Sequence, residues 1–523
     1  MKKFLFTDTQ KFIFAFSLFF VVFANYAFLS KLVSLASAEG NNIVIFTVPL
    51  VLFAIFVLIF NILLLITYKY SFKILLSFFT LAAGLSSYFM NTFGTIIDKD
   101  MIVNAVRTDS AEVFALITPK LIAYFVFLVV LPIFVIIRTK IEYKSYPKEI
   151  LNKLIFICIG LAFIGASYMT LSKNYSSFFR NHNELRFYTN PTYPLYSITK
   201  FVYLQTTTSK KLIPIGLDAK LTPDSKKRLF VLVVGETARA DNFSLNGYSV
   251  KTNPLMEELQ NKNEIVNLTN FTSCGTATAT SVPCLFSKFS KSEYDDDKQY
   301  YENLVDVVNR VGVKVIWIDN NSGGSQGVAN RIKDAKYFGG GKTFDQELLK
   351  ELEKSLENSY QDTLVVLHQE GSHGPTYYQR YPNEFKKFTP TCDTQDLEKC
   401  TQQQIVNTYN NTIAYTDFFL NETIKMMKKY DEKYKTTMMY FSDHGESLGE
   451  NGIYLHGLPY MLAPDTQKHV PAILWFGKDF NKEKIILNSK KTSNLSHDNV
   501  FHTTLGFFGI TTKEYNKSLD LFQ

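Results

Sequence analysis

The chain has 523 residues, of which 46% are hydrophobic and 15% aromatic, and its formal net charge is +7. It contains no dense basic tract, and a nucleic-acid-binding surface needs Lys and Arg clustered on one face, so we exclude that class. The composition is uneven along the chain. Residues 1–170 hold long apolar runs, whereas residues 226–523 have the composition of a soluble domain. We therefore expect two domains, each long enough to bury its own core, joined by a linker over residues 171–225.

Five apolar segments in the first domain are long enough to cross a bilayer, which takes about 20 residues. We place them at residues 12–30, 43–66, 73–92, 119–138 and 151–169. The first domain is therefore predicted to be a bundle of five transmembrane helices.

Positive charges between these segments predict their orientation, because Lys and Arg collect in cytoplasmic loops. They precede the first segment and fill the second and fourth connections: Lys2, Lys3, Lys11, Lys69, Lys73, Arg138, Lys140, Lys144 and Lys148. The connections around residues 31–42 and 93–118 then face outward. Because the number of spans is odd, everything after residue 170 is expected outside the cytoplasm, beginning with a proline-containing linker along the membrane surface.

The cysteines agree with this topology. Four of the five lie in the soluble half as two close pairs, Cys274 with Cys284 and Cys392 with Cys400, and no CxxC spacing occurs. Close pairs of this kind favour structural disulfides, which persist in oxidising compartments.

The soluble half alternates short apolar runs with helical patterns. Strands are predicted at Leu229–Val234, Val313–Ile318, Thr363–Leu367, Thr437–Phe441 and Ala472–Phe476, and helices at Tyr301–Val311, Phe344–Asn358 and Gln403–Tyr430. This alternation predicts an α/β domain in which helices cover both faces of a mainly parallel sheet.

Polar residues follow three of the predicted strands, where functional groups collect in open parallel sheets. Glu236 follows the first strand, His368 and His373 follow the third, and the pair Asp443-His444 follows the fourth, with His456 shortly after. One histidine after a strand is more often a structural residue than a ligand. Carboxylate and imidazole groups on several neighbouring loops are instead typical of a catalytic zinc site.

A candidate nucleophile lies in the segment 274–284, which reads CGTATATSVPC. Its small residues allow a phosphate group to approach closely, and a helix starting there would offer amide donors to the anion. Without the two flanking cysteines a flexible loop would be the better interpretation. Composition leaves four hydroxyl groups open as the nucleophile: Thr276, Thr278, Thr280 and Ser281.

Four motifs resemble the phosphoethanolamine transferases of Gram-negative envelopes, the family of lipid A modifiers and mobile colistin-resistance enzymes. They read VVGETARADNFSLNGY, SCGTATATSVPC, GSHGPTYY and FSDHGESLGENGIYLHG. The resemblance covers nearly the whole chain and implies five spans, a linker and an α/β/α domain of the alkaline-phosphatase and sulfatase type. It also implies a monomeric, multi-pass protein of the bacterial inner membrane with its catalytic domain in the periplasm.

The family pattern assigns roles to individual residues. It implies that Thr276 is the nucleophile and that zinc is held by Glu236, Thr276, Asp443 and His444. His373 and His456 would bind the phosphate group or a second zinc ion, and one would protonate the leaving group. Asn104, Thr108 and Glu112, in the outward loop between the third and fourth spans, would contribute to the lipid-substrate site.

The resemblance implies transfer of phosphoethanolamine from phosphatidylethanolamine, through a phosphothreonine intermediate, to lipid A or a core sugar, giving polymyxin resistance. Alternatives on the same fold are a phosphoglycerol transferase and a metal-dependent phosphatase. A sulfatase would show x-Pro-x-Arg after its nucleophile, which this chain lacks. A transporter would bury ionisable residues in its spans, and these spans hold almost none. One departure concerns a CKGVC stretch of close relatives, which here reads Ser325-Gln326-Gly327-Val328-Ala329, without the positive charge.

Overall fold

The computed structural model describes residues 5–107, 113–114, 116–207, 211–295, 298–339, 343–357 and 359–523, without the side chains of 5, 6, 68–70 and 207. The chain divides into two compact units. The first comprises Met1–Lys99 and Ile117–Val202, and the second comprises Asp100–Leu116 and Tyr203–Gln523. The first unit thus continues into the segment predicted as a linker, and part of the outward loop between the third and fourth spans belongs to the second unit.

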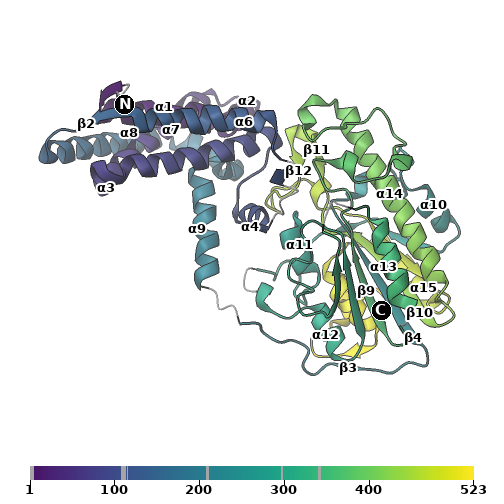
Figure 1. Cartoon of the computed structure of the whole chain (residues 1–523). Helices are drawn as coiled ribbons and strands as arrows, with labels where there is room; N and C mark the ends of the chain where they lie inside the picture. Colours follow the sequence, from purple (N-terminus) through teal and green to yellow (C-terminus); the bar gives the residue numbers. More distant parts are fainter. Residues whose placement is uncertain are drawn as a thin grey trace. The chain divides into compact units, whose positions relative to one another are not determined.

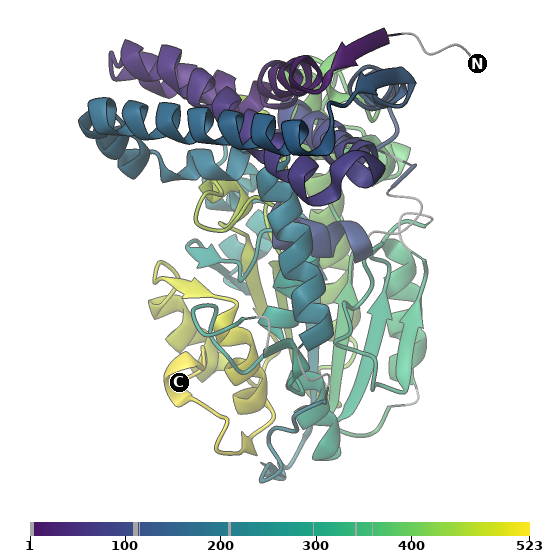
Figure 2. The same cartoon turned by 90° about the vertical axis from the view of Figure 1, so that its left-hand side faces the viewer.

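The first unit is helical. Its elements are β1 (Leu5–Asp8), α1 (Thr9–Phe19), the π-helical turn η1 (Phe20–Ala24), α2 (Tyr26–Ala38), α3 (Asn42–Phe93), α6 (Pro119–Phe125), the π-helical turn η2 (Val126–Val130), α7 (Leu131–Arg138), β2 (Thr139–Glu142), α8 (Tyr146–Asn181), the 3-10 helix η3 (Asn183–Tyr188) and the start of α9 (Thr192–Thr207). Helices α3 and α8 pack along each other (Figures 1 and 2).

Four helical stretches among the described residues are long and apolar enough to cross a membrane: Asn42–Thr67, Ser71–Phe93, Pro119–Arg138 and Tyr146–Asn181. The predicted first span corresponds to a broken pair, Thr9–Ala24 and Tyr26–Ala38, bent by 64°. If this pair counts as one span, the total is five.

Contacts within this unit agree with the predicted sidedness. Strand β1, before the first span, pairs in parallel with β2, in the fourth connection. The Lys73 ammonium, in the second connection, donates to the carbonyl of Thr139 in β2. At the other end, His182 Nε2 after the last span lies 2.7 Å from Glu39 Oε1 after the first. The three regions predicted to be cytoplasmic therefore share one end of the unit.

The second unit contains a seven-stranded sheet in the order β5-β13-β10-β4-β9-β7-β8. The strands are β5 (Ile265–Leu268), β13 (Ala472–Phe476), β10 (Tyr434–Ser442), β4 (Lys227–Gly235), β9 (Thr363–His368), β7 (Lys314–Asp319) and β8 (Asp334–Tyr337). Neighbours from β10 to β8 run parallel, whereas β13 is antiparallel to both β10 and β5. The predicted mainly parallel sheet is confirmed, and all five predicted strands belong to it.

Helices cover both faces of this sheet because alternate side chains of each strand point to opposite sides. Phe230, Leu232 and Val234 of β4 pack in the same core as α12 (Leu304–Arg310) and α16 (Asp498–Phe507). Leu229, Val231 and Val233 pack with α10 (Pro254–Asn261), α13 (Gln346–Glu357) and α14 (Gln402–Lys428) on the other face (Figures 1 and 2).

Smaller elements complete the second unit. They are α4 (Lys99–Arg107), α11 (Thr278–Leu285), α15 (Asn481–Ser489) and the paired short strands β11 (Ser447–Leu448) with β12 (Tyr454–Leu455), β14 (Leu495–Ser496) with β6 (Phe271–Thr272), and β15 (Ile510–Thr511) with β3 (Lys220–Leu221). Disulfides join Cys274 to Cys284 and Cys392 to Cys400, the pairing expected from the sequence.

Candidate active site

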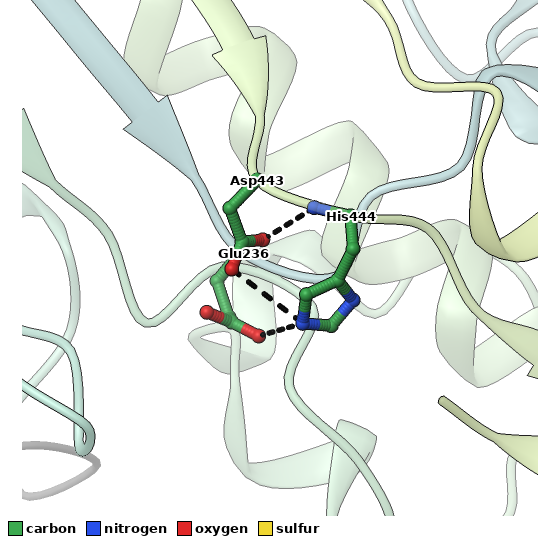
Figure 3. A group of neighbouring side chains, drawn as sticks. All are labelled: Glu236, Asp443 and His444. Carbon is green, nitrogen blue, oxygen red and sulfur yellow. Dashed lines mark hydrogen bonds and ion pairs between the residues drawn. The ribbon is translucent and has the colours of Figure 1, made fainter. Parts of the chain in front are cut away.

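Three buried side chains meet where β4 and β10 end. The two strands are neighbours in register, with Gly235 opposite Ser442, so the residues that follow them are brought together. These residues are Glu236 on one strand and Asp443 and His444 on the other (Figure 3). One ligand atom from each lies within 4.8 Å of the others, and all three side chains are fully buried.

The imidazole of His444 presents one nitrogen to both carboxylates. Its Nε2 lies 3.2 Å from Glu236 Oε1 and 3.5 Å from Asp443 Oδ2 (Figure 3). Its Nδ1 lies 2.9 Å from the carbonyl oxygen of Gly445, which can only accept a hydrogen bond. The proton of a neutral ring therefore belongs on Nδ1, which leaves the Nε2 lone pair available to a ligand.

The carboxylate of Asp443 is only half satisfied by the protein. Its Oδ1 accepts backbone N–H bonds from His444 at 2.7 Å and Thr237 at 3.2 Å. Its Oδ2 is buried and accepts no hydrogen bond from the described residues. A buried carboxylate oxygen of this kind needs a charged partner, and a metal cation is one.

The charges of the cluster agree with this interpretation. Burial, together with the nearby charge of Glu236, raises the pKa of Asp443 to about 7. Burial alone would also raise the pKa of Glu236, but His444, His373 and His456 outweigh it and hold that pKa well below its usual range. Burial lowers the pKa of His444, but the two carboxylates outweigh it and raise the pKa to about 9. Two carboxylates and an imidazole nitrogen in this arrangement fit a divalent cation of the zinc type.

Thr278 brings a hydroxyl group to the same point. Its Oγ1 donates to Glu236 Oε2 at 2.9 Å and lies 3.3 Å from His444 Nε2. Thr278 is the first residue of α11, so the hydroxyl stands at a helix N-terminus, where unpaired N–H groups favour an anion. Asn321, just beyond β7, donates to the same Glu236 oxygen at 2.9 Å and so orients that carboxylate.

Thr276, the residue that the family resemblance implied as nucleophile and ligand, is placed differently. Its hydroxyl donates to the carbonyl oxygen of Leu458 at 2.6 Å, and its own carbonyl accepts from Gly457 N at 2.8 Å. It lines a separate cavity of about 160 Å³ together with Lys291 and Tyr460. The structure therefore directs Thr278, one of the hydroxyl groups that the composition left open, toward the carboxylates and the imidazole.

The two remaining predicted histidines lie beside this cluster. The ring centroid of His456 is 4.3 Å from that of His444 and 5.6 Å from that of His373. Glu446 Oε2 lies 2.9 Å from Nδ1 of His456, which leaves Nε2 of that ring for a substrate. The loop that carries His373 approaches β4 closely because Gly371 adopts a φ of 55°, and a Cβ there would lie 2.7 Å from the carbonyl oxygen of Glu236.

Several supporting residues were not singled out from the sequence. Asp319 is the last residue of β7, and Asn321 lies just beyond it. The rule that functional groups collect at strand ends would have found both. Asp319 Oδ2 lies 3.1 Å from Nδ1 of His368, which makes His368 part of the support rather than of the cluster. Of the predicted lipid-site residues, Asn104 lies on α4, and Thr108 and Glu112 lie outside the described residues.

Comparisons with known proteins match both parts of the chain. A family profile described as Sulfatase matches residues 228–510, and one described as Phosphoethanolamine transferase EptA/EptB matches residues 52–206. Phosphoethanolamine transferase EptA of Escherichia coli K12 is 37% identical over 520 residues, covering 95% of this chain and 94% of the relative. The chain belongs to the phosphoethanolamine transferase family.

Two further relatives cover the same length. Phosphatidylethanolamine transferase Mcr-1 of Escherichia coli is 37% identical over 95% of this chain and 94% of its own. The solved structure of the integral membrane lipooligosaccharide phosphoethanolamine transferase A of Neisseria meningitidis superposes with a TM-score of 0.92 at 35% identity, covering 99% of this chain and 98% of that one. The transferase described here is therefore a membrane-embedded enzyme whose C-terminal unit is periplasmic, and Glu236, Asp443 and His444 form its candidate metal site.

Proposed function

We propose that this transferase moves phosphoethanolamine from phosphatidylethanolamine to lipid A in two steps, with Thr278 as the covalent carrier. The observation that supports it most directly is the Thr278 hydroxyl at the start of α11, 2.9 Å from Glu236 and 3.3 Å from His444. This assignment replaces Thr276, whose hydroxyl is bonded to Leu458. The name of Mcr-1 supports phosphatidylethanolamine as donor, and the name of the Neisseria enzyme supports an acceptor on lipooligosaccharide.

The cofactor in this proposal is zinc, held by Glu236, Asp443, His444 and the hydroxyl of Thr278. Zinc at these groups would lower the pKa of the threonine hydroxyl and neutralise charge on the phosphoryl oxygens. The protein itself orients the acceptor atoms, because Asn321 and two backbone N–H groups hold the carboxylates in place.

In the first step, Oγ1 of Thr278 forms a bond to phosphorus and the bond from phosphorus to the glycerol oxygen breaks. The hydroxyl proton passes along its hydrogen bond to the carboxylate of Glu236, and the leaving diacylglycerol alkoxide takes a proton from His373 or His456. Glu446 supports His456 in this role through the contact to Nδ1. In the second step, an oxygen of the lipid A acceptor forms a bond to phosphorus and the bond from phosphorus to Oγ1 of Thr278 breaks. Thr278 then recovers its proton from Glu236, and the acceptor's proton returns to the histidine.

The same arrangement would serve a phosphoglycerol transferase or a metal-dependent phosphatase, which remain the alternatives. The family comparison favours the phosphoethanolamine head group over both. We further propose that the protein is a monomer of the bacterial inner membrane and that the added amine lowers the negative charge of lipid A, giving polymyxin resistance.

The deciding experiment is the intact mass of the full-length protein after incubation with phosphatidylethanolamine, measured for the wild type, Thr278→Ala and Thr276→Val. We expect a phosphoethanolamine adduct mapped to Thr278 in the wild type and in Thr276→Val, and none in Thr278→Ala. An adduct that persists in Thr278→Ala and disappears in Thr276→Val would return the assignment to Thr276. If the zinc-loaded wild type shows neither the adduct nor released diacylglycerol, the assignment of phosphatidylethanolamine as the donor is wrong.

A further inference from the structure

The first unit contains a cavity of about 450 Å³ that the transfer mechanism does not use. Its apolar wall comes from three helices: Phe28 of α2, Val48, Val51, Leu52 and Ile55 of α3, and Tyr175 and Phe179 of α8. The four positions on α3 have the spacing of one helix face. The volume lies in the range of about 300–1,000 Å³ that is usual for small-molecule sites.

One group of lining residues is polar and lies in or next to η3, directly after α8. It consists of His182, Asn183, Arg186 and Thr189. His182 is balanced by acidic neighbours, since its ring nitrogens lie 2.7 Å from Glu39 and 3.6 Å from Glu184. No carboxylate of the described residues lies within ion-pair distance of the exposed Arg186 guanidinium, which packs 4.7 Å from the ring centroid of Phe187. The cavity therefore joins an apolar wall to a cation with no protein counter-ion.

Tyr175 adds an independent indication of a ligand. The residue is 7% exposed and lines the cavity, yet its hydroxyl group has no hydrogen-bond partner among the described residues. A buried hydroxyl left unsatisfied costs about 1–3 kcal/mol. A molecule with oxygen acceptors would remove that cost.

We propose that this cavity binds a glycerophospholipid of the periplasmic leaflet, with an acyl chain along α3 and α8 and the phosphate group at Arg186. The Tyr175 hydroxyl donates to an ester or phosphate oxygen of the same lipid. The occupant follows from the surroundings, because α3 and α8 contain stretches apolar enough to cross a membrane and bilayer lipid is the solvent around them. Arg186 lies just after the last span, where the chain leads to the periplasmic unit, and its free charge complements a phosphate.

The test is native mass spectrometry of the delipidated full-length protein, titrated with phosphatidylglycerol, a phospholipid other than the proposed donor, and with diacylglycerol of the same acyl chains. The wild type should bind the phospholipid about tenfold or more tightly than diacylglycerol, since a hydrogen bond to a charged group contributes about 1.5–3 kcal/mol. Arg186→Gln should remove this preference, and Arg180→Gln, an exposed arginine of α8 outside the cavity, should keep it.

Larger side chains in the apolar wall of the cavity provide a second, independent test of lipid binding. Leu52→Trp should weaken binding of both lipids at least tenfold, whereas Leu50→Trp, which is 57% exposed on the same helix, should not. Val48→Phe tests the same wall with a smaller change. Binding in Leu52→Trp and Val48→Phe equal to wild type, or an unchanged preference in Arg186→Gln, would overturn the site. These readouts measure binding alone, so they stand apart from the outcome of the transfer assay.

Discussion

Arg107 of α4 donates a hydrogen bond from Nη1 to Oε1 of Gln326 at 3.2 Å. The same nitrogen donates to the carbonyl oxygen of Ala279 at 3.3 Å. Ala279 follows Thr278 in α11, so the guanidinium lies beside the first turn of the helix that carries the candidate nucleophile. Gln326 itself is neutral, and Arg107 therefore brings a positive charge to this loop.

We expect Arg107 to contact the phosphate of the donor, and a hydrogen bond to a charged group contributes about 1.5–3 kcal/mol. We therefore predict that Arg107→Gln lowers kcat/KM for diacylglycerol release about 10–100-fold. Gln326→Lys in that background should recover most of the loss by returning a cation to the same place. Lys251→Gln, a 77% exposed lysine of the same unit, is the matched control for a lost charge. Unchanged kinetics in Arg107→Gln would show that the charge acts only on loop structure.

Metal removal should destabilise the second unit. Both tryptophans, Trp317 in β7 and Trp475 in β13, lie in its sheet, so their fluorescence reports its unfolding in the full-length protein. Adding zinc at about 100 times its Kd should contribute about 2.7 kcal/mol and raise Tm by roughly 3–5 °C over chelator-treated protein. Asp443→Asn should lose most of this rise. It should also melt above the metal-free wild type, because a buried carboxylate facing Glu236 has been removed.

The pH dependence of stability should carry a contribution from Asp417, which is not one of the candidate metal-site residues. Its two oxygens accept the backbone N–H groups of Leu255 at 3.0 Å and Met256 at 2.9 Å, at the start of α10. Burial raises the pKa of this carboxyl from 3.8 to about 7. Between these values the folded state binds more protons than the unfolded state, so the stability that this group contributes is present below about pH 4 and is lost as the pH rises to about 7.

The Tm of Asp417→Asn should therefore fall less between pH 5 and pH 8 than the Tm of the wild type. The corresponding difference in the free energy of unfolding is a few kcal/mol at most. Asp218→Asn serves as the control, because hydrogen bonds from Lys513 and Thr512 lower the pKa of that carboxyl instead. Parallel pH profiles for wild type and Asp417→Asn, read by tryptophan fluorescence, would contradict the assignment.

The two disulfides should separate stability from activity. They close similar loops, with sequence separations of 10 and 8, so removing either by paired Cys→Ala changes should cost about 2–3 kcal/mol. Only Cys274–Cys284 spans the start of α11 and Thr278. We expect the Cys274/Cys284 variant to lose kcat at temperatures where it is still folded, and the Cys392/Cys400 variant to keep it. Equal kcat in both folded variants would argue against a positioning role.

Much of the catalytic unit follows from the sequence because its central strands are unbroken apolar runs. Strands β4, β7, β9, β10 and β13 were all predicted, and each is buried. The edge strands β5 and β8 were not predicted. Strand β5, with the sequence IVNL, is buried but has only four residues, and Asn267 interrupts its apolar run. An edge strand such as β8 pairs on one side only and need not be apolar. Strand β8, with the sequence DAKY, is largely exposed.

The membrane-embedded helices, the sheet and the position of Asp443-His444 could all be predicted from the sequence, since they depend on apolar runs and on the ends of strands. Which hydroxyl group faces the carboxylates and the imidazole of the candidate metal site could not be predicted from the sequence. The direction of a side chain depends on where its helix begins and on partners distant in the chain. The carbonyl of Leu458 engages Thr276 across 182 residues, while α11 begins at Thr278 and turns that hydroxyl toward Glu236.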